Sequence, residues 1–190
     1  RKEESSHSYT CHRVVQVWAV TSTRPTASAP AGGWVAKIVP VPPSDSAAAK
    51  KKKRRKTEAE KIADAVFWEY QLYSNHLRGH TAVPQVPPAG AYGEASGFRY
   101  LVMERLGQNL LEAFEGNGNH FPLCTVADFG KQILECLRQV HEAGLLYLDV
   151  KPQNFMLGSQ GSGLEDKGYV VDFGVADNFI SAKGEHREPG

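Results

Sequence analysis

Cysteine is scarce in this chain, and long apolar segments are missing. The three cysteines, Cys11, Cys124 and Cys136, are odd in number and form no CxxC pair. Such a set argues against a disulfide framework and against a zinc site, and it favours reduced thiols. We therefore expect a reducing compartment, which means a protein of the cytoplasm, the nucleus or both.

No apolar run approaches the roughly 20 residues that a helix needs to cross a bilayer. The sequence therefore predicts no association with a membrane. Hydrophobic residues make up 41% of the 190 residues and charged residues 23%, which is typical of a globular chain. We expect a monomer that forms one domain or two small lobes.

A run of basic residues, KKKKRRK at 50–56, interrupts this ordinary composition. It holds seven of the 22 lysines and arginines, although the net charge of the whole chain is only +1. A run of this kind is usually a solvated loop. It is also typical of segments that bind a nuclear-import receptor or a polyanion, and both interpretations stay open.

The order of the predicted elements indicates an α+β fold in two halves. β-branched and aromatic residues favour strands at 13–20, 34–39, 98–104 and 169–171, and the first two read as a hairpin. The segment 81–97 is rich in proline and glycine and is expected to be mostly loop.

Two longer segments have the apolar periodicity of helices. A capping box of Thr57 with Glu60 opens the first, which spans about 58–78. The second spans about 125–143 and is expected to begin at Thr125. Its predicted apolar stripe consists of Val126, Phe129, Ile133, Leu137 and Val140.

Two short polar clusters follow apolar segments near the end of the chain. The first is Asp-Val-Lys-Pro-Gln-Asn, from Asp149 to Asn154, and the second is Asp-Phe-Gly, which begins at Asp172. Magnesium prefers hard oxygen ligands, which Asn154 and Asp172 supply. A carboxylate such as Asp149 is needed where the attacking hydroxyl group lies. The cation of Lys151 can stabilise the phosphoryl group during its transfer. These residue types therefore fit phosphoryl transfer from ATP.

Over about residues 13–180, the chain resembles eukaryotic protein kinases. Val-Ala-Lys-Ile at 35–38 resembles the strand motif whose lysine binds the α- and β-phosphates of ATP, which implies that role for Lys37. The helix over 58–78 resembles helix αC of kinases. Glu69 corresponds to the glutamate that forms an ion pair with that lysine.

The stretch Met-Glu-Arg-Leu-Gly from Met103 resembles the hinge between the two kinase lobes. The resemblance implies that Met103 is the gatekeeper of the ATP site. It also implies that the backbone of Glu104 and of Leu106 meets adenine.

A finer resemblance is to the casein kinase 1 group, which includes the vaccinia-related kinases. It rests on NFMLG at 154–158, on MERLGQNL at 103–110 and on FWEYQLY at 67–73. The expected fold is therefore the two-lobed, α+β fold of a protein kinase.

The departures from the kinase pattern are equally informative. No glycine precedes Gly32, so a Gly-rich phosphate loop is missing, and Tyr147-Leu148-Asp149 replaces the usual His-Arg-Asp. The missing arginine normally receives a phosphate on the activation segment, so Leu148 argues against that switch. Only 16 residues follow Gly174. We therefore expect a chain that is incomplete at both ends, marginally folded and inactive in isolation.

The expected organisation has four regions. They are a disordered or partial N-terminus at 1–12, an N-lobe at 13–103 with a basic insert at 44–56, the start of a C-lobe at 104–180, and a truncated activation segment at 181–190.

The leading hypothesis is a serine/threonine protein kinase that uses ATP and Mg²⁺ and acts on a protein substrate. Asp149 would accept the proton of the substrate hydroxyl, and Lys151 would stabilise the transferring phosphoryl group, while Asn154 and Asp172 would hold magnesium. A pseudokinase that binds a protein partner without catalysis is the alternative, motivated by the missing Gly-rich loop. A polyanion-binding protein led by residues 50–56 is the third hypothesis.

Overall fold

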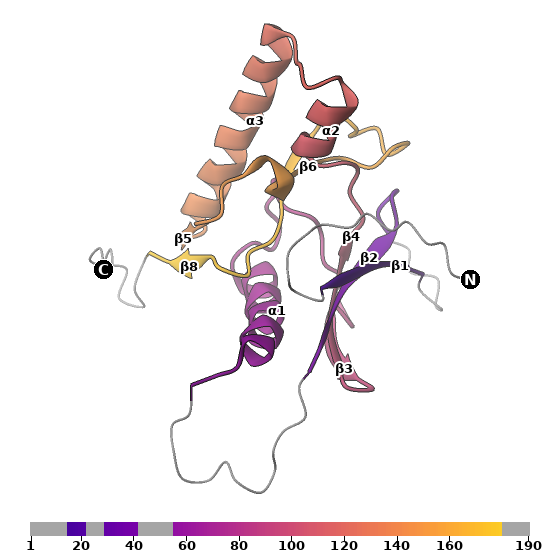
Figure 1. Cartoon of the computed structure of the whole chain (residues 1–190), viewed down its shortest axis with the longest axis vertical. Helices are drawn as coiled ribbons and strands as arrows, with labels where there is room; N and C mark the ends of the chain where they lie inside the picture. Colours follow the sequence, from indigo (N-terminus) through magenta and orange to yellow (C-terminus); the bar gives the residue numbers. More distant parts are fainter. Residues whose placement is uncertain (1–14, 22–28, 42–54, 180–190) are drawn as a thin grey trace, which may run out of the picture.

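The chain folds into a sheet-containing part and a mainly helical part, which lie at opposite ends of the molecule (Figure 1). A four-stranded sheet with one long helix, α1, forms the first part, and two further helices, α2 and α3, dominate the second. The predicted α+β fold in two halves is present. The computed structural model describes residues 15–21, 29–41 and 55–179.

The four-stranded sheet is antiparallel throughout, in the strand order β1-β2-β4-β3. Its members are β1 (Gln16–Val20), β2 (Trp34–Pro40), β3 (Tyr92–Ala95) and β4 (Phe98–Glu104). The three strands predicted for this part are therefore present, and the first two pair as a hairpin. In the register of β2 with β4, Lys37 lies opposite Leu101.

The segment 81–97 is mostly loop, as predicted, but it also contains the four residues of β3, which was not predicted. This strand pairs with β4 across a turn in which Ser96 has a φ of 52° and Gly97 a φ of 77°. A short strand that contains Gly93 has little intrinsic β propensity. Its pairing with β4 and the packing of Tyr92 on α1 supply the stabilisation that propensity does not.

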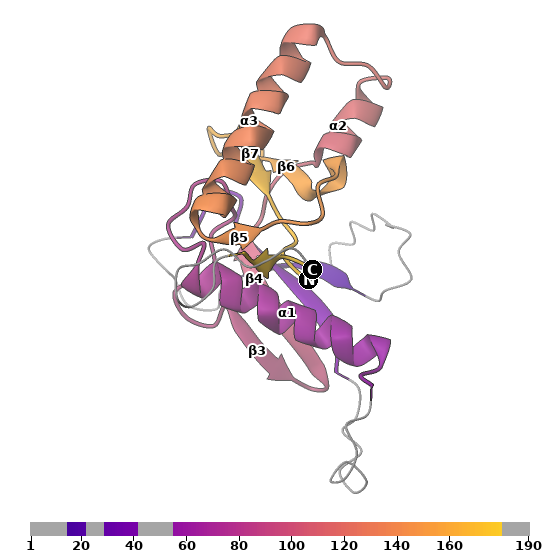
Figure 2. The ribbon, with the colours of Figure 1, turned by 90° about the vertical axis from the view of Figure 1, so that its left-hand side faces the viewer.

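Helix α1 (Glu58–Asn75) begins at the predicted capping box. The side chain of Thr57 accepts a hydrogen bond from the Glu60 amide at 3.2 Å, and the Glu60 carboxylate accepts one from the Thr57 amide at 2.7 Å. The helix ends three residues before the predicted boundary. Figure 2 shows α1 running across the sheet, and it contacts both β2 and β4. Its buried residues are Ala63, Val66, Glu69, Leu72 and Tyr73.

Helix α3 (Leu123–Glu142) begins two residues earlier than predicted, directly after Pro122. Proline suits this place because its φ is compatible with a helix and it has no amide proton to leave unpaired. Val140, at the end of the predicted stripe, is fully buried, whereas Val126 near its start is 50% exposed. The stripe is therefore covered mainly toward the C-terminal end of the helix.

Helix α2 (Leu110–Gly116) was not predicted, although a sequence signal for it exists. Asn109 and Glu112 form a capping box, in which each side chain accepts a hydrogen bond from the other residue's amide at 2.9 Å. The helix has only seven residues, so its apolar periodicity is too short to be recognised.

Short elements complete the helical part and carry the two polar clusters. The first polar cluster lies between β5 and β6, and Asp172 follows β7 by two residues. The predicted strand at 169–171 is present, shifted by one residue. The strands pair as β5 with β8 and as β6 with β7. These elements are β5 (Leu145–Leu146), the 3₁₀ turn η1 (Pro152–Asn154), β6 (Phe155–Leu157), β7 (Gly168–Val170) and β8 (Asp177–Asn178).

One hydrophobic cluster runs through both parts of the molecule. It joins Leu101 of the sheet and Leu72 of α1 to Val140 of α3 and Phe173, all of them fully buried. Because the two parts share this cluster, the segment around Phe173 is held between them. The Asp-Phe-Gly segment therefore lies against the packed core.

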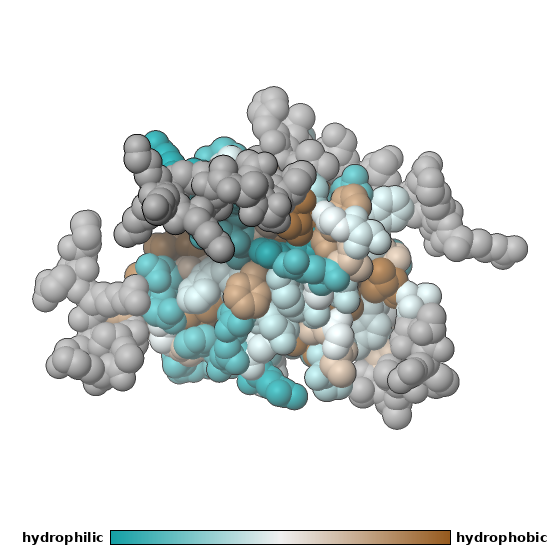
Figure 3. All heavy atoms as spheres, turned by 90° about the horizontal axis from the view of Figure 1, so that it is seen from below, coloured by the Kyte–Doolittle hydropathy of each residue, from teal (hydrophilic) through white to brown (hydrophobic). Residues whose placement is uncertain are grey.

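The surface at the end that carries α1 and β3 is mixed in character. Figure 3 shows hydrophilic and weakly hydrophobic residues over most of this face, with strongly hydrophobic atoms in separate spots. Within the described residues, no helix combines the length and the apolar character that a bilayer span requires.

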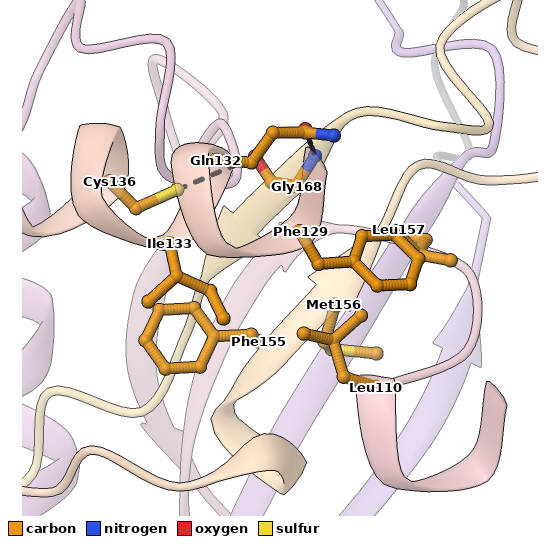
Figure 4. A pocket seen from close by; sticks show the side chains of 9 residues that line it. All are labelled: Leu110, Phe129, Gln132, Ile133, Cys136, Phe155, Met156, Leu157 and Gly168. Carbon is orange, nitrogen blue, oxygen red and sulfur yellow. Dashed lines mark hydrogen bonds between the residues drawn. The ribbon is translucent and has the colours of Figure 1, made fainter. Parts of the chain in front are cut away.

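A small apolar pocket lies between α3 and the β6–β7 pair (Figure 4). Gln132 closes one edge, where its side chain accepts a hydrogen bond from the Gly168 amide at 2.5 Å, and the Cys136 thiol lies 3.6 Å from the Gly168 carbonyl. Burial raises the pKa of the Cys136 thiol to about 11. None of the predicted site residues lines this pocket.

Candidate functional site

The ammonium of Lys37 lies between two carboxylates. Its Nζ atom is 2.7 Å from Oε2 of Glu69 on α1 and 2.9 Å from Oδ1 of Asp172, which follows β7. The ion pair with Glu69 was predicted and is present. The contact with Asp172 was not predicted, because 135 residues separate the two side chains in the sequence.

Lys37 and Asp172 each stabilise the charged form of the other. Burial lowers the pKa of the Lys37 ammonium, but Glu69 and Asp172 outweigh that effect and raise it. Burial likewise raises the pKa of the Asp172 carboxyl, and Lys37 outweighs it, so that the pKa is lowered. For Glu69, which is 1% exposed, burial is the largest influence and raises the pKa against the pull of Lys37. Lys37 and Asp172 are therefore charged at neutral pH.

Glu69 also connects α1 to the Asp-Phe-Gly segment. Its Oε1 atom accepts a hydrogen bond from the Phe173 amide at 3.2 Å, while Oε2 is bound to Lys37. The Phe173 ring is fully buried and packs edge-on against Tyr73 and Tyr147, with ring centroids 5.4 and 5.3 Å apart. Through its ring, Tyr147 thus links the loop of Asp149 to the Asp-Phe-Gly segment.

The first polar cluster forms a compact loop. Lys151 Nζ lies 2.7 Å from Oδ2 of Asp149, and the Asn154 side-chain amide donates to the same oxygen at 2.8 Å. Asn154 also donates to the Asp149 carbonyl at 3.0 Å. The nitrogen of Asn154 is thus engaged, and its side-chain oxygen is the atom that can act as an acceptor or metal ligand.

The two polar clusters lie next to each other. The Val171 amide donates to the Asn154 carbonyl at 3.0 Å, in continuation of the β6–β7 pairing, so Asn154 and Asp172 stand at the ends of neighbouring strands. The described residues contain no group of three or more histidine, cysteine or acidic side chains that suits a metal ion. One amide oxygen and one carboxylate nevertheless fit Mg²⁺, which usually takes few protein ligands and completes its shell with phosphates and water.

The predicted hinge is attached to both parts of the molecule. Met103, at 9% exposure, lies at the end of β4, and Glu104 exchanges hydrogen bonds with Gln85 at 2.7 and 3.0 Å. The Arg105 amide donates to the Gly33 carbonyl at 2.9 Å, and the Gly107 amide donates to the Leu157 carbonyl at 2.8 Å. These bonds fix the backbone on both sides of Leu106.

Glycine is required where this hinge meets the loop after β6. A Cβ atom on Gly107 would stand 2.5 Å from the Gly158 carbonyl oxygen. A Cβ atom on Gly32 would stand 2.3 Å from Oγ of Ser159 and 2.6 Å from the Arg105 carbonyl oxygen. The close approach of these three backbone segments therefore depends on residues without a side chain.

The structure thus brings Lys37, Glu69 and Asp172 into direct contact and sets them beside the loop of Asp149, Lys151 and Asn154. Sequence reasoning missed Arg99 on β4, which donates to the Ala63 carbonyl of α1 at 2.6 Å and to Glu94 at 2.6 Å. The alternation of β4 gives no sign of this contact, because an arginine on a strand usually points to solvent.

Comparison with known proteins agrees with this geometry. The model of the protein kinase domain matches residues 31–188. A casein kinase I homologue of Schizosaccharomyces pombe, homolog 3, is 34% identical over 134 residues, which are 70% of this chain and 29% of that protein. Casein kinase I homolog 2 of Saccharomyces cerevisiae is 31% identical over 134 residues, 70% of this chain and 23% of that protein.

A probable serine/threonine-protein kinase of Dictyostelium discoideum is 38% identical over 96 residues, which are 50% of this chain and 19% of that protein. The matches thus span less than a third of the length of these curated relatives. The fold and the arrangement of the two clusters define a protein kinase domain. The chain belongs to the protein kinase family and, within it, to the casein kinase 1 group.

Proposed function

We propose that the protein is a serine/threonine protein kinase, which transfers the γ-phosphoryl group of ATP to a hydroxyl group of a protein substrate. One observation carries the proposal. A lysine held by a buried glutamate lies against Asp172, directly beside a loop in which Asp149 is bound by Lys151 and Asn154. Phosphoryl transfer needs these groups together because its catalysis is positioning plus charge stabilisation.

Lys37 is the residue for the α- and β-phosphates of ATP. In the structure its ammonium has two carboxylate partners, of which Glu69 is buried and Asp172 is the more exposed. An incoming phosphate can replace Asp172 while Glu69 keeps the ammonium in place. Asp172 would then be available to hold a metal ion.

Asn154 and Asp172 would hold Mg²⁺, which when bound neutralises charge on the phosphates. Adenine would lie at the hinge, against Met103 and the backbone of Glu104 and Leu106. The hydrogen bonds that fix this backbone support the assignment, because backbone groups that bind adenine need a defined position.

Asp149 would orient the substrate hydroxyl and accept its proton. Its contact with Asn154 fixes the carboxylate in one orientation. Lys151, whose ammonium lies 2.7 Å from the same carboxylate, is placed to stabilise the charge of the transferring phosphoryl group.

The test is transfer of labelled γ-phosphate from Mg-ATP to casein and to a library of serine- and threonine-containing peptides. Asp149→Asn and Asp172→Ala are each expected to lower transfer at least a hundredfold. Asp128→Asn is the matched control, since Asp128 is an exposed carboxylate on α3. Activity that survives Asp149→Asn or Asp172→Ala would contradict these assignments.

A pseudokinase is the alternative, favoured by the Tyr-Leu-Asp sequence at 147–149 in place of His-Arg-Asp. It would bind a protein partner and transfer no phosphate in this assay. Nuclear or cytoplasmic location and binding of an import receptor or polyanion by residues 50–56 stay predictions. Of that run, only Arg55 and Lys56 lie within the described residues, and Lys56 forms an ion pair with Asp64 at 2.7 Å.

A further inference from the structure

The four-stranded sheet has one face that α1 covers and one that faces away from it. Side chains alternate between the two faces along each strand. Lys37 on β2 and Leu101 on β4 lie on the side of α1, since Lys37 binds Glu69 and Leu101 belongs to the hydrophobic cluster. Their sequence neighbours therefore lie on the other side, which we call the outer face.

The outer face is almost entirely apolar. An antiparallel sheet that packs one face on a core usually presents polar side chains to water on the other. Among the described strand residues of this face, the polar exceptions are Gln16 and Glu104, and the Glu104 carboxylate accepts a hydrogen bond from the Gln85 amide at 3.0 Å. No lysine or arginine of the four strands lies on it. Its apolar side chains include Trp18, Trp34, Ile38, Phe98, Tyr100 and Val102.

These side chains form continuous rows across the strands. Trp18 of β1 lies beside Ala36 of β2, which in turn lies beside Val102 of β4. In the next row Tyr100 lies across Gly93 of β3, because a Cβ atom on Gly93 would stand 2.4 Å from the Tyr100 hydroxyl oxygen. The glycine therefore allows an aromatic ring to extend the apolar surface to the edge strand.

The outer face is open to solvent in the described part of the chain. Trp18 is 41% exposed and Phe98 is 47% exposed. The half-buried Trp34, Ile38 and Tyr100 are not among the side chains that pack against the hydrophobic cluster. A contiguous apolar surface of this kind, unlike single exposed apolar residues, indicates an interaction site.

The size of the outer face decides what can cover it. Strands lie about 4.8 Å apart and rise about 3.3 Å per residue, so the sheet is about 15 Å wide and about 20 Å long. This footprint of roughly 300 Å² is less than half of the roughly 800 Å² that each partner of a stable dimer buries. The face is therefore too small to hold a second copy of this chain.

A single helix, by contrast, matches the outer face in size. A helix is about 10 Å across, which fits the width of the sheet. The covered face shows the same match, since α1 alone runs across β2 and β4 there (Figure 2). The absence of lysine and arginine from the described outer face also argues against a nucleic acid, which needs cations for its phosphates.

We propose that the outer face of the sheet is a docking site for an amphipathic helix of a partner protein. The helix presents aliphatic and aromatic side chains at every third and fourth position, with no charge in that stripe, because the outer face offers no cation and its one carboxylate is already bound. An interface of this size is transient. The site faces away from Lys37, so the proposal does not depend on the proposed kinase function.

The test screens the full chain against displayed helical peptides of 18 residues, the length of α1. One library carries the apolar stripe, and the other holds the same residues in scrambled order. Peptides with the stripe are expected to be enriched and to bind with dissociation constants on the order of 10 μM, measured by fluorescence anisotropy. High salt should leave this binding unchanged, because the contact is apolar.

Trp18→Ser/Phe98→Ser should weaken peptide binding at least tenfold. Leu123→Ser is the matched control, since Leu123 is an apolar residue of α3 that is 84% exposed, and it should leave binding unchanged. Thermal unfolding verifies that both variants are folded. Independently of any variant, NMR of the unmodified chain should show that a bound peptide shifts the amide signals of Ala36 and Val102, but not that of Leu72 in α1.

The proposal is overturned if peptides with the stripe are not enriched over scrambled ones. Binding that survives in the folded double variant, or NMR shifts that leave out the outer face, would also overturn it. Two other occupants are part of the test. Dimerisation of the unmodified chain that the double variant abolishes would assign the face to a second copy. Binding of a single-stranded oligonucleotide that the double variant abolishes would assign it to nucleic acid, and either result contradicts the proposal.

Discussion

Helices α1 and α3 have similar lengths and similar overall apolar content, but they are buried to different extents. Five of the 18 residues of α1 are buried, against two of the 20 residues of α3. α1 packs on β2 and β4 and contacts the Phe173 segment, whereas α3 packs on β5 and β7 and leaves Leu123 84% and Leu134 68% exposed. Neighbours, and not apolar content, decide the burial of a helix.

The two helices also differ in where their charged side chains lie. α1 buries Glu69 completely and pairs it with Lys37, while the ion pairs of α3, such as Arg138 with Glu135, lie at the surface. Buried pairs are costly to break on one side only, and exposed pairs contribute little. The position of α1 is therefore the more strongly determined of the two, and α1 is the helix that carries a site residue.

The largest effect is expected from Lys37→Ala, which leaves the Glu69 carboxylate buried without a cation. We expect the free energy of unfolding at pH 7 to fall by about 3–5 kcal/mol, measured by urea denaturation. The double variant Lys37→Ala/Glu69→Gln should recover part of this loss, because its buried side chain is neutral. Equal urea midpoints for Lys37→Ala and the unmodified chain would show that the ion pair of Lys37 with Glu69 does not stabilise the position of α1.

Truncation of one leucine on each helix tests the contrast directly. Leu72→Ala on α1 removes a fully buried side chain and should cost about 2–5 kcal/mol. Leu134→Ala on α3 removes a side chain that is 68% exposed and should change stability by less than about 0.5 kcal/mol. Similar losses for the two variants would mean that α3 is covered in solution and that the contrast is wrong.

Much of this contrast could not be predicted from the sequence. The strands β2 and β4, the capping box of α1 and the two polar clusters follow from local patterns, and the structure contains them. The pairing of Lys37 with Glu69 was expected through the kinase resemblance. Local patterns do not indicate how much of α3 is covered, since burial depends on residues that are distant in the sequence.

The missed features share a physical cause. The strand β3 is stabilised by its partner strand, and α2 is shorter than the period that reveals a helix. The contacts of Lys37 with Asp172 and of Tyr147 with Val171 link residues that are 135 and 24 positions apart. Neither contact has a local signature, because each joins segments that are distant in the sequence.

Arg99 offers a further test of how α1 is held. Its side chain is 16% exposed and connects β4 to the Ala63 carbonyl and to Asp64 on α1. Arg99→Ala should lower the free energy of unfolding by about 1–2 kcal/mol. Arg138→Ala, an exposed arginine with two glutamate partners on α3, is the control and should cost less than about 0.5 kcal/mol. If Arg138→Ala lowered the free energy of unfolding more than Arg99→Ala, the contrast between the two helices would be wrong.

The smallest effect is expected at Tyr73, whose hydroxyl group is buried and has no hydrogen-bond partner among the described residues. Tyr73→Phe removes this group and should leave stability unchanged or raise it by up to about 1 kcal/mol, as measured by thermal unfolding. Tyr147→Phe removes a hydroxyl group that has a partner and should lower stability. Equal destabilisation by both substitutions would show that the hydrogen bond of the Tyr147 hydroxyl contributes nothing to stability.

The most direct test of the central claim, that Lys37, Glu69, Asp172 and Asn154 form one nucleotide site, is calorimetric titration with a non-hydrolysable ATP analogue. We predict that Mg²⁺ strengthens binding at least tenfold, and that Asp172→Asn loses this Mg²⁺ dependence with the fold intact. Affinity that is the same with Mg²⁺ and with EDTA, in both the unmodified protein and Asp172→Asn, would contradict it.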